Sequence, residues 1–282
     1  MTTDPLITIP PSSLTLRRVT ALGRRVEARV RTLDLIQWED VPFGDEEDEG
    51  LHIWELNDLC PRDGWPAVLL IHDQWLGTPH HSFSRLGPAL SHKGMMTAMM
   101  PSSVGSCKPW PQPLNDVLKA IEFLRSQQID LDRLAVWGHG SGGHLAIMAA
   151  LQRPEWIKCA VAVSAPINLA ELNETQPHAI EDAFGSVDLS EVSPIKAHNA
   201  DAPPILLVSG DADTTCPIQH AIKYQQQQLR VTCMSVAGAD HGLRWPLLGT
   251  FRARRAAIQW VTDQLKMPDR RSKWRRKKRR ES

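Results

Sequence analysis

Short apolar runs alternate with longer stretches of helical periodicity over residues 26–267. This alternation is typical of a mostly parallel sheet covered by helices on both faces. Three early runs predict an antiparallel leading edge: Val26–Arg31, Leu33–Trp38 and Leu51–Leu56. Later runs predict buried strands: Ala67–Ile71, Met95–Met100, Leu134–Trp137, Cys159–Val163, Ile205–Ser209 and Val231–Val236. The pattern therefore predicts an α/β fold.

Helical spacing predicts the segments between these strands. The expected helices cover residues 82–93, a segment that begins after Asn115, a segment that ends at Leu151, residues 218–229 and residues 253–266. The second has Val117, Leu118, Ile121 and Leu124 at helical spacing, and we expect Asn115 to be its N-cap. Residues 165–204 lack strand character, so we expect an insert that forms a cap or wall over the site.

The charge distribution separates the end of the chain from its body. Residues 269–282 hold nine Lys and Arg against Asp269 and Glu281, so this end carries +7 and, with a net charge of zero, the rest carries −7. We predict an N-terminal extension (residues 1–25), one α/β domain (26–267) and a disordered basic tail (268–282). An alternative for residues 270–280 is contact with nucleic acid or an anionic surface.

Other compositional features exclude several classes of protein. The sequence has no stretch of eighteen apolar residues and no secretory leader pattern, so we expect no transmembrane segment and a cytoplasmic location. The five cysteines are scattered without CxxC spacing and are expected to be reduced packing residues. No HExxH or comparable ligand spacing occurs, so we expect neither a metal nor an organic cofactor.

The segment Val136–Ala146 lies between a predicted strand and a predicted helix, which is the setting of a nucleophile elbow. Gly138 and Gly142 have the G-x-S-x-G spacing, but the central residue is Gly140, which has no side chain to attack a carbonyl. Shifting the frame makes Ser141 central and puts a histidine at the first close-packed position. Ser141 is therefore expected to begin the helix and cap its backbone N–H groups, and as a nucleophile it is the weaker alternative.

An acid and a histidine follow the elbow in the chain order that this type of site uses. Asp213 follows the strand Ile205–Ser209, and His241 follows the strand Val231–Val236. We predict that His241 is the general base and that Asp213 orients it. The alternative is that Asp211 and Asp213 only form Asx turns and that His241 is an ordinary loop histidine.

These motifs resemble the feruloyl-esterase and carboxylesterase-like branch of the α/β hydrolases, which is related to lipases and kynurenine formamidases. The matching segments are Val41–Gly44, Leu51–Trp54, Trp110–Asp116, Ser164–Asn168, Ser193–Ile195, Pro203–Leu207 and His241–Gly242. The family elbow reads G-H-S-A-G-G-H-L-A, and residues 138–146 match it except at Gly140 and Ser141. The resemblance implies the α/β-hydrolase fold and action on carboxylic esters.

A second departure lies after the strand Ala67–Ile71. Where the family has H-G-G-G-W, this chain has His72-Asp73-Gln74-Trp75, which we expect to form the oxyanion or substrate-binding loop. Glycines there let backbone N–H groups face the developing oxyanion, whereas a carboxylate opposes it. Dienelactone hydrolases are similar in having an acidic residue after the histidine, but they place a cysteine at the elbow.

Three functions follow as hypotheses. The first is an esterase-like or lipase-like protein that has lost catalysis because Gly140 replaces the serine. The second is an active hydrolase of small esters, amides or lactones, in which His241 and Asp213 act with Ser141 or water. The third is a protein that binds an ester-like ligand or a partner without turnover, in a pocket between Trp75, the elbow and residues 165–204.

Overall fold

A computed structural model describes residues 7–9, 35–44, 49–73, 83–100, 108–243 and 247–267 of the chain. Within these residues, nine strands form one sheet in the order β1-β9-β8-β7-β6-β4-β5-β3-β2. The strands are β1 (Ile7–Ile9), β2 (Leu35–Pro42), β3 (Gly50–Leu56), β4 (Trp65–Ile71), β5 (Met96–Met100), β6 (Ile129–His139), β7 (Cys159–Val163), β8 (Ile205–Gly210) and β9 (Val231–Val236). The pairs β2–β3 and β3–β5 are antiparallel and the others are parallel. The predicted fold class is confirmed.

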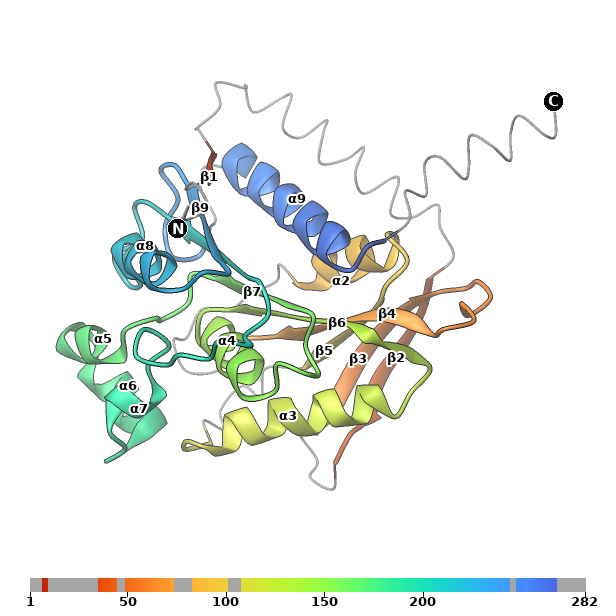
Figure 1. Ribbon diagram of the computed structural model, residues 1–282, viewed down its shortest axis with the longest axis horizontal. Helices are drawn as coiled ribbons and strands as arrows, with labels where there is room; N and C mark the ends of the chain where they lie inside the picture. The colour runs from red at the N-terminus through yellow and green to blue at the C-terminus, as the bar shows by residue number, and fades with distance from the viewer. Residues whose placement is uncertain are drawn as a thin grey trace.

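Helices cover both faces of the sheet (Figure 1). They are α2 (Phe83–Ser91), α3 (Gln112–Arg125), α4 (Ser141–Gln152), α5 (Leu169–Thr175), α6 (Pro177–Phe184), α7 (Leu189–Val192), α8 (Ile218–Gln227) and α9 (Leu247–Gln264). One core joins the sheet to α3, α4 and α8, and the other joins it to α2 and α9. Leu69 and Ile71 point into the first core, while Val68 and Leu70 point into the second. The continuous apolar run in β4 is thus explained, because both faces of this strand are buried.

Residues 165–204 form a helical insert that consists of α5, α6, α7 and their connections. They bury a small apolar cluster of their own: Leu169, Leu172, Ile180, Ala183, Phe184 and Val192. In Figure 1 the insert lies beside the N-terminal end of α4, which follows β6 in the chain. The predicted absence of strands in this segment is confirmed.

Several predicted boundaries are wrong. The helix expected to begin after Asn115 begins at Gln112, with Pro111 at the N-cap position. Pro113 is tolerated in that first turn because a helix does not use the N–H groups there. Strand β6 begins at Ile129 rather than Leu134, since a buried Ile129 pairs with Trp65. The final helix begins at Leu247 rather than Ala253.

Some predictions fall on residues outside the described part of the chain. These are the strand Val26–Arg31 and the basic tail, residues 268–282. Within the predicted extension, residues 1–25, the described strand β1 pairs in parallel with β9, with Ile7 opposite Met234. At least this part of the extension belongs to the sheet.

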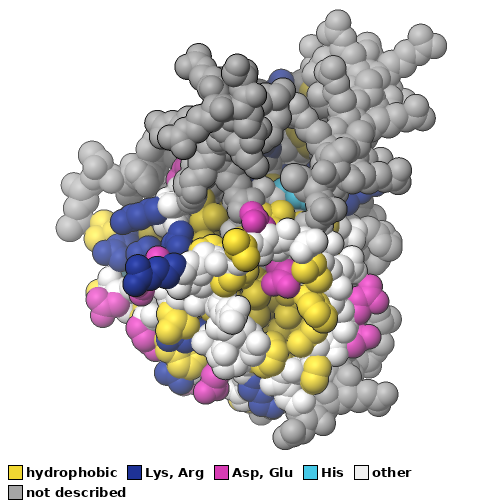
Figure 2. Space-filling view, turned by 90° about the vertical axis from the view of Figure 1, so that its right-hand side faces the viewer, with side chains coloured by type: hydrophobic (Ala, Val, Ile, Leu, Met, Phe, Trp, Pro, Cys, Tyr) yellow, Lys and Arg dark blue, Asp and Glu magenta, His cyan; other side chains and the backbone are white. Residues whose placement is uncertain are grey.

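The opposite edge of the sheet is formed by β2, whose middle residues are exposed. Trp38 is 52% exposed, and its indole N–H donates to Glu55 on the neighbouring strand at 3.2 Å. The pairing with β3 shifts between Trp38 and Val41, where Asp40 has a φ of 52°. Figure 2 shows the molecule from the side where β2 and β3 lie, with acidic side chains set among the apolar ones. An irregular edge with charged neighbours disfavours pairing with a second sheet.

Candidate active site

The turn between β6 and α4 has Gly140 at its apex, with φ of 55° and ψ of −126°. This backbone conformation is strained for residues other than glycine and is typical of functional turns. The neighbouring glycines are required by close packing: a Cβ on Gly138 would lie 1.9 Å from the carbonyl oxygen of Gly142. A Cβ on Gly142 would lie 2.2 Å from the carbonyl oxygen of Ile71. The predicted elbow is therefore present, and a residue without a side chain occupies its apex.

Ser141 is the first residue of α4 and is fully buried. Its hydroxyl donates to Oδ1 of Asp73 at 2.6 Å, and its backbone N–H donates to the same oxygen at 3.1 Å. No side-chain hydrogen bond caps α4 at Gly140. The expectation that Ser141 begins the helix is correct, but its hydroxyl is a donor to a carboxylate sixty-eight residues away in the sequence.

Asp73 follows β4 and is only 7% exposed. A Cβ added at Gly140 would lie 2.8 Å from Cγ of Asp73, so this carboxyl group lies directly over the apex of the elbow. His72, the preceding residue, places Nε2 3.2 Å from the sulfur of Met99 and packs against the ring of Phe83. The other two residues of the predicted loop, Gln74 and Trp75, lie outside the described part of the chain.

Asp213 and His241 meet although twenty-eight residues separate them. Nδ1 of His241 lies 2.9 Å from Oδ2 of Asp213, while Oδ1 accepts the backbone N–H groups of Thr215 at 2.9 Å and Cys216 at 2.8 Å. Nε2 of His241 has no hydrogen-bond partner among the described residues. The structure thus brings together the acid and the histidine named from the sequence, with Nδ1 held by the carboxylate and Nε2 buried without a described partner.

Cys216 was not predicted to belong to this neighbourhood. Burial raises the pKa of its thiol well above the ordinary value, and the charges of Asp213 and Asp73 raise it further. The second effect shows that both carboxylates lie near one buried thiol. His139, the residue before the apex, also lies here, with its ring centroid 5.9 Å from that of His241. The position of Cys216, three residues after the predicted acid Asp213, could have indicated that its side chain lies near the site.

A buried histidine connects α4 to the helical insert. Nε2 of His144 lies 2.7 Å from the carbonyl oxygen of Val192, and its ring packs against Trp110 and Phe184. Burial lowers the pKa of His144 to about 4, although the hydrogen bond to Val192 partly opposes that effect. The imidazole is therefore neutral at pH 7 and acts as a donor to the insert.

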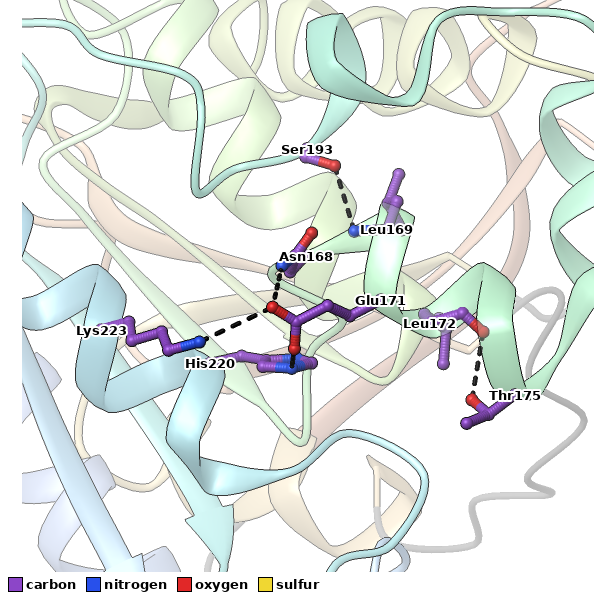
Figure 3. Close-up of polar contacts among 8 residues, drawn as sticks. All are labelled: Asn168, Leu169, Glu171, Leu172, Thr175, Ser193, His220 and Lys223. Atoms are coloured by element: carbon purple, nitrogen blue, oxygen red, sulfur yellow. Dashed lines mark hydrogen bonds and ion pairs between the residues drawn. The ribbon is translucent and has the colours of Figure 1, made fainter.

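A second contact joins the insert to α8 (Figure 3). The carboxylate of Glu171 on α5 forms an ion pair with His220, accepts from Nδ2 of Asn168 at 2.7 Å, and lies 3.6 Å from Nζ of Lys223. The hydrogen bond to His220 is the main reason that the pKa of Glu171 is lowered. Because α8 follows the loop that carries Asp213, this contact fixes the insert relative to that loop.

A separate hollow of about 640 Å³ lies at the amino-terminal ends of the central strands, away from the elbow. Its lining includes Asp130, Arg133, Trp156, Lys158 and Lys266, which are at the amino-terminal ends of β6 and β7 and the end of α9. Ligands of open α/β sheets bind at the carboxyl ends of the strands, so this hollow is not the candidate site. Among the described residues, no group of three or more His, Cys, Asp or Glu could hold a metal ion.

Comparison with known proteins identifies the family. The model of the prolyl oligopeptidase family matches residues 110–268, which include the elbow, Asp213 and His241. The chain belongs to the prolyl oligopeptidase family. It is also 24% identical to the esterase LipC of Mycobacterium tuberculosis, over 72% of this chain and 59% of that protein. It is 23% identical to dipeptidyl peptidase family member 6 of Caenorhabditis elegans, over 75% of this chain and 32% of that protein. The chain thus spans less than two thirds of the length of these curated relatives.

Solved structures share the fold of this chain. A truncated carbohydrate esterase from gut microbiota superposes with a TM-score of 0.70 at 20% identity, over 83% of this chain and 98% of that chain. Brefeldin A esterase, a bacterial homologue of human hormone-sensitive lipase, superposes with a TM-score of 0.66 at 16% identity, over 94% of this chain and 91% of that chain. These likenesses show that the chain has the α/β-hydrolase fold. No helix within the described residues is long and apolar enough to cross a membrane.

Proposed function

We propose that this member of the family has lost acyl-enzyme chemistry and binds a small ester-like or amide-like ligand beside Asp213 and His241. The observation that carries the proposal is the glycine at the apex of the elbow. An acyl-enzyme needs a nucleophile at that apex, within reach of the histidine. Gly140 has no side chain, and the hydroxyl of the next residue, Ser141, is buried and donates to Asp73.

The rest of the site supports binding. Nε2 of His241 is buried and has no partner among the described residues, so a ligand that enters the site satisfies this atom with one hydrogen bond. The helical insert is held to α4 and α8 by His144 and Glu171, and in this proposal it forms a fixed wall of the site. A preorganised wall lowers the entropic cost of binding a small molecule.

A second candidate function is slow hydrolysis by water. Nε2 of His241 has no hydrogen-bond partner among the described residues, and the side chain missing at Gly140 removes the group that would otherwise accept the acyl portion. His241 could take a proton from a water molecule that attacks the ester carbonyl, with release of acid and alcohol and no covalent intermediate. Enzymes without their nucleophile retain about 10³–10⁴-fold acceleration over water, so such activity would be weak.

Two assays separate these functions. The full chain is treated with a fluorophosphonate probe, and its hydrolysis of p-nitrophenyl acetate and butyrate is compared with that of His241→Ala. The proposal expects no labelled serine and the same hydrolysis rate in both proteins, together with an NMR perturbation of His241 by an unhydrolysed short-chain amide. Labelling of Ser141 would overturn it in favour of serine catalysis. Turnover that depends on His241 without labelling or a burst would overturn it in favour of attack by water.

A further inference from the structure

The N-terminus of α4 carries a donor that this fold ordinarily reserves for a reacting oxygen. In α/β hydrolases, the backbone N–H of the residue after the nucleophile is one of the donors that stabilise the oxyanion. Here that residue is Ser141, and its N–H donates to Oδ1 of Asp73 at 3.1 Å. The hydroxyl of Ser141 donates to the same oxygen at 2.6 Å. A carboxylate also suits the positive end of this twelve-residue helix. The oxyanion position therefore already contains an anion from within the chain.

The same carboxyl group fills the space that a nucleophile would need. A Cβ at residue 140 would lie 2.8 Å from Cγ, 2.9 Å from Oδ2 and 3.0 Å from Oδ1 of Asp73. These distances are shorter than ordinary van der Waals contacts between such atoms. Asp73 is buried and held by two hydrogen bonds from Ser141, so it resists displacement. The carboxylate of Asp73 thus occupies the space that a side chain at residue 140 would need.

We infer that Asp73 determines the specificity of this site: its carboxylate occupies the oxyanion position and excludes ester carbonyl oxygens and carboxylate ligands from it. Removing Asp73 opens an anion site at the N-terminus of α4 that accepts a short-chain carboxylate or a phosphonate. The inference deepens the proposed function and rests on it in one respect, namely that the unmodified chain forms no acyl-enzyme.

Restoring catalysis therefore requires two changes. In Asp73→Gly/Gly140→Ser, the introduced hydroxyl has room, and the Ser141 N–H is released to bind the oxyanion. The oxygen of the hydroxyl forms a bond to the ester carbonyl carbon while its proton passes to His241. The ester C–O bond then breaks, p-nitrophenolate leaves, and the proton on His241 passes to the solvent. Water hydrolyses the acyl-enzyme and regenerates the hydroxyl, with His241 again carrying the proton.

The labelling experiment compares the unmodified chain, Gly140→Ser, Asp73→Gly and the double variant. Fluorophosphonate labelling replaces the P–F bond with a bond from phosphorus to the serine oxygen and releases fluoride. The inference expects the double variant to react about 100-fold faster than Gly140→Ser, which is the typical effect of one oxyanion donor. Equal labelling of Gly140→Ser and the double variant would overturn it, because serine alone would then restore the site.

A binding experiment remains informative if the double variant does not fold. Butyrate is titrated into Asp73→Gly and the unmodified chain, and the Ser141 amide is followed by NMR. The inference expects a dissociation constant at least about tenfold lower for Asp73→Gly. The matched control, Asp73→Asn, keeps the volume of the side chain and is expected to bind butyrate no better than the unmodified chain. Far-UV circular dichroism and melting temperature establish that each variant is folded.

The two proposals fail in different ways. If folded Asp73→Gly binds butyrate no better than the unmodified chain, the role of Asp73 is wrong even when the unmodified chain remains unlabelled. If Ser141 of the unmodified chain is labelled, the proposed function is wrong, while the butyrate comparison still decides whether Asp73 fills the anion position.

Discussion

The imidazole of His144 donates from Nε2 to the carbonyl oxygen of Val192, 2.7 Å away, inside the fully buried contact between α4 and the helical insert. A carbonyl oxygen can only accept, so Nε2 carries the proton of a neutral ring. Burial penalises the charged form and is the dominant reason that the pKa is low. This pair makes the contact between the helix of the elbow and the insert sensitive to pH.

Stability is expected to fall in mildly acidic solution. The pKa of His144 is about 4 in the folded chain against an ordinary value of 6.5, so the unfolded chain binds more protons between these values. The stability is fully present above about pH 6.5 and is lost as the pH falls toward 4, by about 3 kcal/mol. Urea unfolding from pH 7 to pH 4 measures this loss.

His144→Gln is expected to flatten that pH dependence, because glutamine keeps a donor but does not titrate. The matched control is His178→Gln, which alters an exposed histidine on α6 and should leave the slope unchanged. An unchanged slope in His144→Gln would show that another group causes the acid sensitivity.

The contact between Glu171 and His220 is expected to hold the insert locally. Glu171→Gln removes the charge that pairs with His220 and Lys223, so amide hydrogen exchange in α5–α7 should become faster. The change in global unfolding free energy should remain below about 1 kcal/mol, because Glu171 is a half-exposed partner. Glu174→Gln, on the exposed face of the same helix, is the control. Equal exchange rates in the two variants would contradict the assigned role.

The low pKa of Glu171 gives the contact a pH dependence. Its hydrogen bond with His220 lowers the pKa, so the stabilisation is present above the ordinary pKa of a glutamate and is lost as the pH falls through the lowered value. The protection factors of the amides in α5–α7, which correct for the slower intrinsic exchange at acid pH, should therefore fall as the pH is lowered in the unmodified chain. In Glu171→Gln this component should be absent.

Asp213→Asn is expected to change the tautomer of His241. The N–H groups of Thr215 and Cys216 require an oxygen at the Oδ1 position, which turns the new amide nitrogen toward Nδ1 of His241. Nδ1 must then accept, so the proton moves to Nε2. Long-range ¹H–¹⁵N correlation spectra report this change.

The control for that experiment is Asp211→Asn on the same loop. Asp211 accepts from the N–H of Gly238 at 2.6 Å, whereas Nδ1 of His241 lies against Asp213, so replacing Asp211 should preserve the tautomer. A tautomer that is the same in all three proteins would mean that Asp213 does not set the orientation of the ring.

The cysteines are expected to differ in reactivity. Cys60 is exposed, while Cys159, Cys216 and Cys233 are buried and free. Burial raises the pKa of Cys233 to about 12 and also raises those of Cys159 and Cys216, so the buried thiols have little thiolate at pH 8. In a Cys107→Ser background, an Ellman assay should modify Cys60 in the native chain and the other three only after unfolding. Modification of native Cys216 at the rate of Cys60 would contradict this assignment.

Much of the fold could be predicted because its signal is local. The strands β7 and β9 have the predicted bounds, since apolar runs between polar turns define them. The elbow was also found correctly, because Gly138 and Gly142 are spaced as a tight strand-to-helix turn requires. The order of Asp213 and His241 after two successive strands indicated their meeting, since parallel strands end at one edge.

Other features had weak local signals. β1 has only three residues. β6 begins with the buried Ile129, but charged residues follow it directly, so the start of the strand does not have an apolar pattern. Two prolines flank Gln112, the first residue of α3, and they favour a later start of the helix. In each case pairing or packing with distant residues outweighs the local pattern.

The sequence by itself determined that a sheet of parallel strands carries an elbow with glycine at its apex, because periodicity and glycine spacing are properties of neighbouring residues. Only the tertiary structure decided that the carboxylate of Asp73 lies over that glycine and accepts from Ser141, and that His144 reaches Val192. These contacts join residues 68 and 48 positions apart. Their geometry depends on how β4, α4 and the insert pack together, which no local pattern encodes.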